Sequence, residues 1–250
     1  MSHAEVMQTT TTRRRGRPRA APTDGNADTR EQILRAAGQL FAHQGYAATG
    51  TREIAALVGV RQASIFHHFA HKEDILAELL DRTVAPALAV APALAVAGTL
   101  GNPRVSAPAR LYWLARHDAE NLCEAARAGA VPAVLQLLPE ARAPRFDAFW
   151  AKRHELRSRY QALIAEAVEA RLVIHLPLEV LTDLVFASVE ATMLWDTHFS
   201  ELHPPEIADA VACAAVRGIL RRPPSNDNLR REARRLIDLS QTRPPGRFSR

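Results

Sequence analysis

Apolar residues recur at helical spacing along most of the chain, and no stretch alternates as a half-buried strand would. Beyond about residue 105 this pattern predicts helices over about 108–128, 144–171, 178–198 and 205–220, with a shorter one near 131–138. Prolines stand at the joints between these segments, where helices normally end: Pro132, Pro139, Pro144, Pro177, Pro204 and Pro205. The sequence therefore predicts an all-α fold.

The N-terminal part carries the signals of shorter helices. Thr29 and Gln32 have the spacing of a capping box, and Gly45 suits the end of the helix that follows. A second helix starts near Thr51 and stops at Gly59, and a third and a fourth follow it. Two short helices joined by a tight glycine turn can place the second of them in the major groove of DNA. The pattern predicts a helix-turn-helix between about residues 50 and 69.

The outward side chains of this motif are of types that bind DNA. Ile65 and Phe69, four residues apart, are expected to hold the third helix to the body of the protein. Thr51 and Arg52 open the second helix, where a phosphate can bind. Gln can pair with adenine and Arg with guanine, while Ser and aromatic rings contact phosphate or the thymine methyl group. The candidates on the third helix are Arg61, Gln62, Ser64, Phe66, His67 and His68.

About 50 residues here resemble the N-terminal domain of TetR-type regulators. The resemblance rests on residues 29–37 (TREQILRAA) and on Leu40-Phe41, Gly45-Tyr46, Thr49, Ile54-Ala55, Gly59-Val60, residues 65–69 (IFHHF) and Lys72-Glu73. Members of this family are all-helical homodimers, most often repressors. The resemblance implies that the first three helices bind DNA, and that a divergent C-terminal domain binds a small ligand and dimerises.

The resemblance also assigns roles by position. Thr51 matches a hydroxyl that contacts phosphate, and Lys72 matches a phosphate-binding lysine. Gln62 and Ala63 match a pair that lies against bases and is usually Lys and Gly, so the preferred operator bases do not transfer. Phe66 and His67 match aromatic positions that touch the backbone or thymine, and Phe66 lacks the hydroxyl of the common Tyr. Arg61 stands where the family often has a capping Ser.

The two ends of the chain are basic. Residues 1–28 hold five Arg against three acids, and the last 30 residues hold nine Arg against three acids, within an overall net charge of +5. We expect a disordered arm over 1–28 and a basic, flexible tail over 222–250, although 229–239 could form a short helix. Arg15, Arg17 and Arg19 surround an Arg-Gly-Arg-Pro core that resembles an AT-hook and could enter a minor groove. The alternative is a solvated charge run without a defined role.

A tandem repeat follows the fourth helix. Residues 85–90 read APALAV, and residues 91–96 repeat them. Pro86 and Pro92 argue against one straight helix through this segment. The repeat could be a kinked helix or a loose connector, and the pattern leaves both open.

Residues 76–221 are expected to form the ligand-binding and dimerisation domain, behind a DNA-binding domain over 29–75. The helices near 178–198 and 205–220 are strongly apolar, and the resemblance places the dimer interface there. Aromatic and polar side chains between the helices could line a pocket, although each could equally be plain core. The pocket candidates are Trp113, His117, Asn121, Phe149, Trp150, Phe186 and Met193, with Asp118 and Asp196 as further polar groups.

Other kinds of site find little support. Cys123 and Cys213 lie far apart and are expected to be buried thiols. His67 and His71 could share a helical face, but no Cys or acid nearby completes a metal site. We therefore expect no metal and no cofactor. No apolar run reaches the roughly 18 residues that cross a bilayer, so a cytoplasmic, nucleoid-associated protein is expected.

The predicted function is that of a ligand-responsive repressor which binds a palindromic DNA operator as a homodimer. Two alternatives remain. An enzyme would need a catalytic motif, and the chain has no Gly-rich phosphate loop, Gly-x-Ser-x-Gly elbow or His-Glu-x-x-His. A non-specific architectural protein would bind DNA through its basic ends alone. The effector, the operator and the regulated genes do not follow from the sequence.

Overall fold

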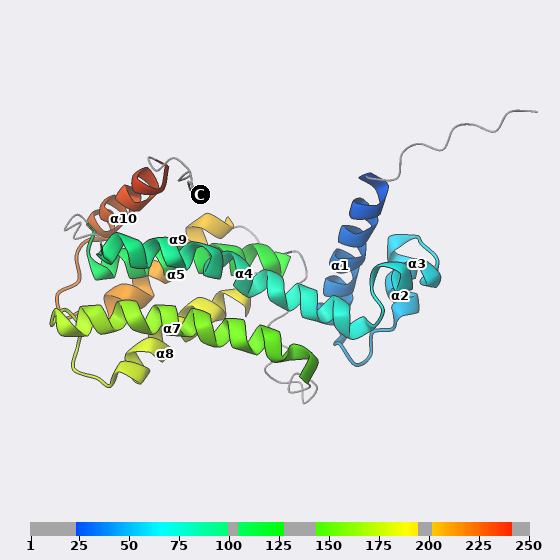
Figure 1. Cartoon of the computed structure of the whole chain (residues 1–250), viewed down its shortest axis with the longest axis horizontal. Helices are drawn as coiled ribbons and strands as arrows, with labels where there is room; N and C mark the ends of the chain where they lie inside the picture. The colour runs from blue at the N-terminus through cyan, green and yellow to red at the C-terminus, as the bar shows by residue number, and fades with distance from the viewer. Residues whose placement is uncertain (1–23, 100–104, 128–143, 195–201, 242–250) are drawn as a thin grey trace, which may run out of the picture.

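The computed structural model describes residues 24–99, 105–127, 144–194 and 202–241, and these form two lobes joined by one long helix (Figure 1). The small lobe contains α1 (Asp24–Gln44), α2 (Thr51–Val58) and α3 (Gln62–His68). The connecting helix is α4 (Lys72–Thr99). The large lobe adds α5 (Ala107–Arg127), η2 (Pro144–Phe146), α7 (Asp147–Glu169), α8 (Leu178–Glu190), η3 (Ala191–Leu194), α9 (Pro204–Ile219) and α10 (Asn226–Gln241). The prediction of an all-α protein is confirmed.

The small lobe folds around a few large apolar side chains. Ile33 and Leu34 of α1 and Ile54 of α2 are fully buried, and Ile65 and Phe69 hold α3 as expected. Each fully buried aliphatic side chain of this size contributes roughly 1.5–3 kcal/mol. Because α3 has only seven residues, it is too short to be stable alone, and packing on α1 and α2 supplies its stability.

Helix α1 begins at Asp24, five residues before the expected Thr29. Asp28 carries a negative charge near the start of the helix, where the helix dipole favours it. Gln32, expected to complete a capping box with Thr29, instead donates to the carboxylate of Asp28 at 2.8 Å. The expectation of disorder up to residue 28 is therefore wrong for residues 24–28.

Helix α4 runs through the tandem repeat and through both of its prolines. Pro86 has no N–H, so the carbonyl of Arg82 loses its usual partner one turn along the helix. Asn121 of α5 replaces that partner: its Nδ2 lies 3.3 Å from the Arg82 oxygen and 3.1 Å from the Thr83 oxygen. The structure thus resolves the open alternatives in favour of a helix, stabilised from outside.

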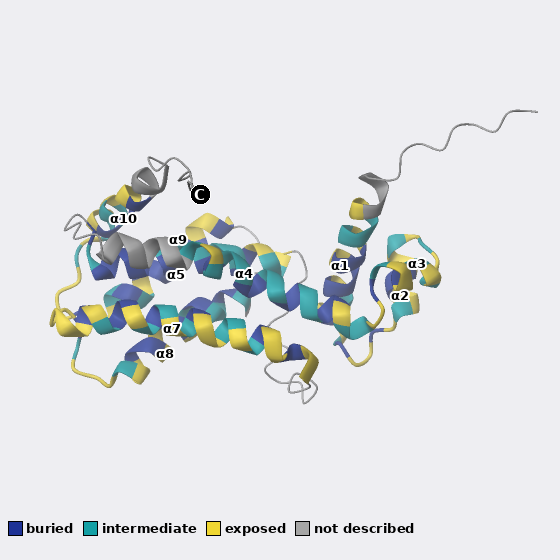
Figure 2. Cartoon of the chain, in the orientation of Figure 1, coloured by how far each residue is buried: buried dark blue, intermediate teal, exposed yellow. Residues whose placement is uncertain are grey.

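Helix α5 lies at the centre of the large lobe and packs against α4, α7, α8, α9 and α10. It is buried around most of its circumference, whereas α7 keeps an exposed outer face (Figure 2). Leu111, Leu114 and Ala115 of α5 are almost completely buried, as is Tyr160 of α7. The predicted burial of both thiols is confirmed, since Cys123 and Cys213 are free and buried.

The C-terminal segment forms helix α10 and packs on the large lobe. Leu229, Ala233 and Leu236, at helical spacing, are all buried. Arg230 of α10 forms an ion pair with Asp209 of α9, which also accepts the hydroxyl hydrogen of Tyr112. Hydrogen bonds from the Arg230 guanidinium lower the pKa of Asp209 below its ordinary value. The expectation of a flexible tail is therefore wrong for residues 226–241.

Several smaller expectations can also be compared with the structure. Helices α5, α7 and α9 end within a few residues of their predicted bounds, whereas α8 gives way to the short 3-10 helix η3. The predicted helix near 131–138 lies outside the described residues. In the part that the structure describes, extended pairing is limited to one bridge between Val173 and Leu220. None of the described helices is long and apolar enough to cross a membrane.

Candidate nucleic-acid interface and inner cavity

Two glycines shape the helix-turn-helix. Gly59 ends α2 with φ 78° and ψ 25°, a left-handed conformation that costs a residue with a Cβ about 1 kcal/mol or more. Gly50 is the N-cap of α2, and its N–H donates to the Glu53 carboxylate at 2.8 Å. Gln44 of α1 donates to the same carboxylate at 3.2 Å. These contacts fix the start of α2 relative to α1, and α2 in turn carries α3.

Gln62, the first residue of α3, joins the two helices of the motif. Its amide nitrogen Nε2 donates to the Thr51 hydroxyl at 2.9 Å, and its Oε1 accepts from Arg52 Nε at 3.2 Å. Three of the predicted DNA-binding residues, Thr51, Arg52 and Gln62, therefore form one polar cluster. In this cluster Gln62 also holds Thr51 and Arg52 in place, a role that the sequence did not indicate.

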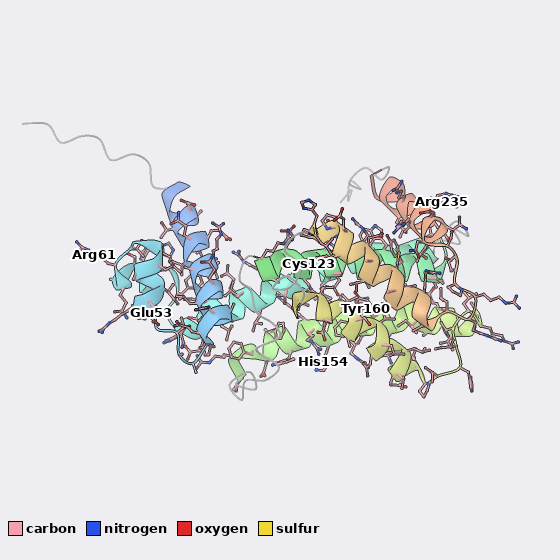
Figure 3. The ribbon with its side chains drawn as sticks, turned by 180° about the vertical axis from the view of Figure 1, so that it is seen from behind. Glu53, Arg61, Cys123, His154, Tyr160 and Arg235 are labelled. Atoms are coloured by element: carbon pink, nitrogen blue, oxygen red, sulfur yellow. The ribbon has the colours of Figure 1, made fainter. Side chains whose placement is uncertain are left out.

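The outer face of α3 is free of packing within the described part of the chain. Arg61, Ala63, Phe66 and His67 are exposed, with Phe66 at 50% of its full exposure, and Ser64 and His68 are half-buried. Arg61 lies at the far end of the small lobe, away from the large lobe (Figure 3). It makes no side-chain cap to α3, in agreement with the loss of the family's capping Ser.

His68 differs from its neighbour in its surroundings. Partial burial, together with the charges of His67 and Arg30, lowers the pKa of His68 below its ordinary value. Its ring meets that of His67 edge to face, at 5.5 Å between centroids. At neutral pH His68 of the protein without DNA is therefore mainly uncharged, and a DNA contact for it stays a prediction.

Lys72, expected to bind phosphate, is already engaged within the protein. Its Nζ donates to the carbonyls of Tyr46 and Thr49, each at 2.8 Å, and lies 4.1 Å from the centre of the Tyr46 ring. Lys72 thus fastens the start of α4 to the turn between α1 and α2. A phosphate contact for Lys72 stays a prediction. Arg15, Arg17 and Arg19 lie outside the described residues.

Four charged side chains connect α1 to α4. Arg30 pairs with Glu78, and Arg82 pairs with Glu31 at 2.8 Å and with Glu78 at 3.0 Å. Arg30 also covers the ring of Phe69, at 4.7 Å from its centre. We call this group the α1–α4 clamp. Exposed pairs contribute little stability singly, but this network fixes the direction in which α4 leaves the small lobe. The complementary charges were visible in the sequence, but their pairing over about 50 residues was not.

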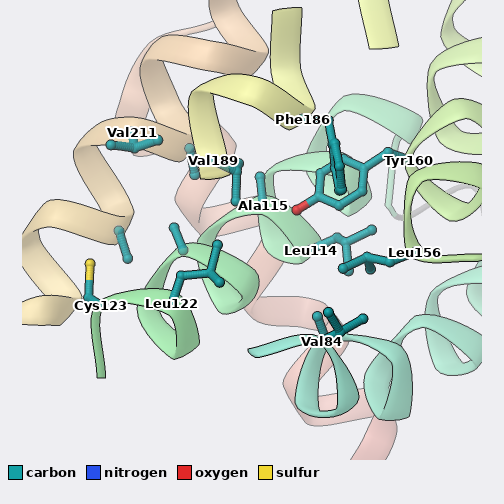
Figure 4. Packing of buried hydrophobic residues seen from close by; sticks show 14 of the residues in the cluster. Val84, Leu114, Ala115, Leu122, Cys123, Leu156, Tyr160, Phe186, Val189 and Val211 are labelled. Atoms are coloured by element: carbon teal, nitrogen blue, oxygen red, sulfur yellow. The ribbon is translucent and has the colours of Figure 1, made fainter. Parts of the chain in front are cut away.

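The large lobe encloses a cavity between α4, α5, α7, α8 and η3. The space between the side chains is small, about 20 Å³, and part of it is open to solvent. Of the seven predicted pocket residues, Phe149, Trp150, Phe186 and Met193 line it. The other lining residues are Thr83, Val84, Asp118, Leu122, Arg153, Leu156 and Glu190. Figure 4 shows Val84, Leu156 and Phe186 in this part of the core, beside Tyr160.

The other three predicted pocket residues do not line this cavity. Asn121 is turned to the carbonyls of α4, where it compensates for Pro86. Trp113 and His117 stack on each other at 5.3 Å, and burial lowers the pKa of His117. The prediction was wrong for these residues because helical spacing shows which residues share a face, but not which neighbour that face meets.

Asp118 is a carboxylate of the cavity that is almost completely buried. It is 2% exposed, and its Oδ2 accepts the hydroxyl hydrogen of Tyr160 at 2.8 Å. Its Oδ1 is buried and has no hydrogen-bond partner within the described structure. Burial raises the pKa of Asp118 to about 7, and the charge of Glu190 acts in the same direction. In the described part of the chain, no cluster of His, Cys, Asp and Glu could hold a metal ion.

Helices α8 and α9 present an apolar face to solvent. Val180 and Leu184 of α8 are 43% and 48% exposed, and Ala187 follows on the same side. Helix α9 packs against α8 and, beyond its first turn, leaves only small residues exposed: Ala210, Ala214 and Gly218. The two helices together form a surface without a partner in the described chain, which we call the α8–α9 face.

Comparison with known sequences locates the family signal in the small lobe. Residues 33–79 match the model of the bacterial regulatory proteins of the tetR family. The HTH-type transcriptional repressor KstR2 of Rhodococcus jostii is 40% identical over 63 residues. That match covers 25% of this chain and 31% of the relative, so the curated relative is matched over about a third of its length.

Solved structures extend the likeness to both lobes. The chain resembles AmtR of Mycobacterium smegmatis with a TM-score of 0.66 and 36% identity, over 92% of this chain and 100% of that one. The ketosteroid transcriptional regulator KstR2 of Mycobacterium tuberculosis shares the fold, with a TM-score of 0.61 and 20% identity over 77% of this chain and 95% of that one. The helix-turn-helix, the family match and the full-length likeness agree, and the chain belongs to the TetR family of bacterial transcriptional regulators.

Proposed function

We propose that this protein is a sequence-specific DNA-binding repressor that acts in the cytoplasm as a homodimer and releases its operator when a small molecule binds. The observation that carries the proposal is the outer face of α3. Arg61, Phe66 and His67 are exposed there, on a lobe that Lys72 and Arg82 of α4 hold through the α1–α2 turn and α1. A short helix with one free polar and aromatic face is the form that enters a major groove.

The cluster of Thr51, Arg52 and Gln62 supports the same assignment. All three side chains lie near the N-terminal ends of α2 and α3, where helix dipoles favour a phosphate. Arg52 and Thr51 are held by Gln62 before any DNA binds, so they lose little side-chain freedom on binding. We infer that Gln62 orients the phosphate contacts, and that Arg61 and Phe66 reach the base edges.

The α8–α9 face is proposed as the dimer interface. Its large apolar side chains on α8 lie beside small residues on α9, so a second copy related by a two-fold axis can pack closely on it. Burying this surface removes exposed Val180 and Leu184 from water. A two-fold dimer would present two copies of α3 to a palindromic operator.

Helix α4 is proposed to connect the cavity to the DNA-binding lobe. Thr83 and Val84 line the cavity, and Arg82 and Glu78, on the adjacent turn, belong to the α1–α4 clamp. A ligand that shifts α4 in the cavity would therefore also shift the small lobe. The distance between the two copies of α3 would change, and the operator would be released.

The test begins with selection of binding sites from random DNA by the full-length protein, followed by footprinting of the selected sites. We expect a palindromic footprint with half-sites about one helical turn apart. Arg61→Ala should weaken operator binding by roughly 5- to 150-fold, the range for loss of one specific base contact. Arg159→Ala, on the outer face of α7, is the matched control and should have no effect.

The outcomes separate the classes of function. Uniform coverage of random DNA, with equal affinity for selected and unselected sequences, would support a non-specific architectural protein. Absence of any DNA binding would contradict the proposed function and favour the alternative that the protein is an enzyme. Wild-type affinity of the Arg61→Ala and Phe66→Ala variants would show that the outer face of α3 does not read DNA.

A further inference from the structure

The cavity contains three charged side chains among aromatic rings. Two of them neutralise each other, because Arg153 donates to Glu190 through Nε at 2.7 Å and through Nη2 at 2.6 Å. The Arg153 guanidinium also lies over the ring of Phe186, at 5.1 Å from its centre. This paired geometry is the strongest form of an arginine–carboxylate contact. Arg153 is therefore committed to Glu190, and the third charged group stands apart from it.

That third group is Asp118. Its Oδ2 accepts from Tyr160, a neutral donor, and its Oδ1 accepts from no group of the described structure. Burying a carboxylate without a cationic partner costs so much free energy that proteins rarely retain such a group unless it has a function. The groups that face it from neighbouring helices are Arg153 and Tyr160 of α7, Glu190 of α8, and the uncharged Thr83 and Val84 of α4. The cavity thus has one carboxylate in excess.

Three classes of ligand can be compared with this chemistry. An anion would meet Asp118 and Glu190 and would be repelled. A neutral hydroxyl or amide could donate to Oδ1 but would leave the charge unbalanced. A cation could donate to Oδ1 and balance the charge, and Phe149, Trp150 and Phe186 line the space around it. The apolar lining favours a ligand whose remaining body is hydrophobic.

We propose that the cavity binds a small amphipathic organic cation, whose protonated nitrogen donates to Oδ1 of Asp118 while its apolar body packs among Phe149, Trp150 and Phe186. This inference rests on the effector role proposed above and names the chemical class of the effector. The enclosed space is only about 20 Å³, far below the range for small-molecule sites, so binding of such a ligand requires the lining side chains to move apart.

The ionisation of Asp118 gives the proposal a second signature. Burial raises the pKa of this carboxyl to about 7, so near pH 7 about half of the molecules carry a proton on it. A cation at Oδ1 would lower that pKa again and expel the proton. Binding of a cation at pH 7 should therefore release about half a proton, whereas binding of a neutral molecule should release none.

The experiment uses three probes with one apolar body: 4-phenylbutylamine, 4-phenylbutan-1-ol and 4-phenylbutyrate. Their binding to the full-length protein without DNA is measured by calorimetry at pH 7, in phosphate and in Tris buffer, so that proton release is measured as well. We expect the amine to bind at least about tenfold more tightly than the other two, with proton release. The Asp118→Asn variant should reduce this preference to less than about threefold. Asp183→Asn, the same change in a surface ion pair of α8, should retain it.

A second readout separates this inference from the proposed function. Release of selected operator DNA by the amine tests the effector role, whereas binding without DNA tests the ligand class alone. Binding of the amine without operator release would support the ligand class and overturn the effector role. The wild-type comparison and the proton release do not depend on the folding of any variant. Equal binding of the three probes, tighter binding of the acid, or no binding by any of them would overturn the proposed ligand class.

Discussion

Replacing Asp118 by asparagine should change how the stability of the protein depends on pH. The carboxyl of Asp118 has a pKa of about 7 in the folded protein, raised by burial from an ordinary value of 3.8. Between these two values the unfolded chain has lost the proton and the folded protein keeps it. Stability therefore falls as the pH rises from about 4 to about 7, and the loss is complete above that window. The amide of the Asp118→Asn variant cannot ionise, and its oxygen can still accept from Tyr160.

The magnitude follows from the same two pKa values. A difference of one in pKa corresponds to about 1.4 kcal/mol. Between pH 5 and pH 8 the wild-type protein should lose about 2.5 kcal/mol from this group, and the Asp118→Asn variant should lose none of it. The variant should therefore gain about 2.5 kcal/mol relative to wild type over this range, whatever its stability at pH 5.

The assay is urea unfolding followed by circular dichroism at several pH values. Protein concentration is held fixed, because dimerisation contributes to the measured stability. Asp183→Asn, in an exposed pair with Arg157, is the control and should follow the wild-type curve. Parallel curves for the wild type and the Asp118→Asn variant from pH 5 to pH 8 would refute the reasoning, because they would show that Asp118 ionises alike in both states.

Three further predictions concern the elements that hold the fold. Asn121→Ala should cost about 1–3 kcal/mol in unfolding free energy, because the Arg82 carbonyl is left without a donor. The cost should shrink in a Pro86→Ala background, where the restored N–H can replace Asn121, and additive costs in this double-mutant cycle would contradict the proposed compensation. Leu229→Ala should cost about 2–5 kcal/mol because this side chain is 1% exposed; a loss no larger than that of exposed Asn228→Ala would show that α10 is not docked. Asp209→Asn should lower stability at pH 7 and have less effect in acid, since Arg230 lowers the Asp209 pKa and the contribution is lost as the pH falls through that lowered value. Urea unfolding curves at pH 7 and in acid measure the stability difference between this variant and the wild type. An equal loss of stability at both pH values would argue against the ion pair.

The local elements of the small lobe could be predicted because their signals lie within a few residues. Gly59 in a left-handed conformation, and Ile65 and Phe69 four apart, define a turn and a buried face without distant partners. The helical period and the prolines likewise predicted most helices of the large lobe. The start of α1 was placed too late, since the acidic residues before Thr29 were assigned to the basic arm.

The cavity was predictable only in part. Four of its aromatic and sulfur-containing residues were identified because large side chains at helical spacing fill interiors. Asn121 was assigned to it wrongly, and Arg153 and Glu190 were not considered, because charged residues on a helix are usually solvated. Only the packing of α7 against α8 brings Arg153 and Glu190 together.

The sequence by itself determined the helical periods, the helix-turn-helix and the side chains on the outer face of α3, since all of these depend on neighbours within one or two turns of helix. Tertiary structure alone decided three other features. Helix α4 continues through Pro86 because Asn121 supplies a donor from another helix. Helix α10 is ordered because Leu229 is buried and Arg230 finds Asp209. Asp118 is left with an unpartnered oxygen because the packing of neighbouring helices buries it and no donor of the described chain hydrogen-bonds to Oδ1. Each depends on contacts between residues far apart in the chain, which no local pattern encodes.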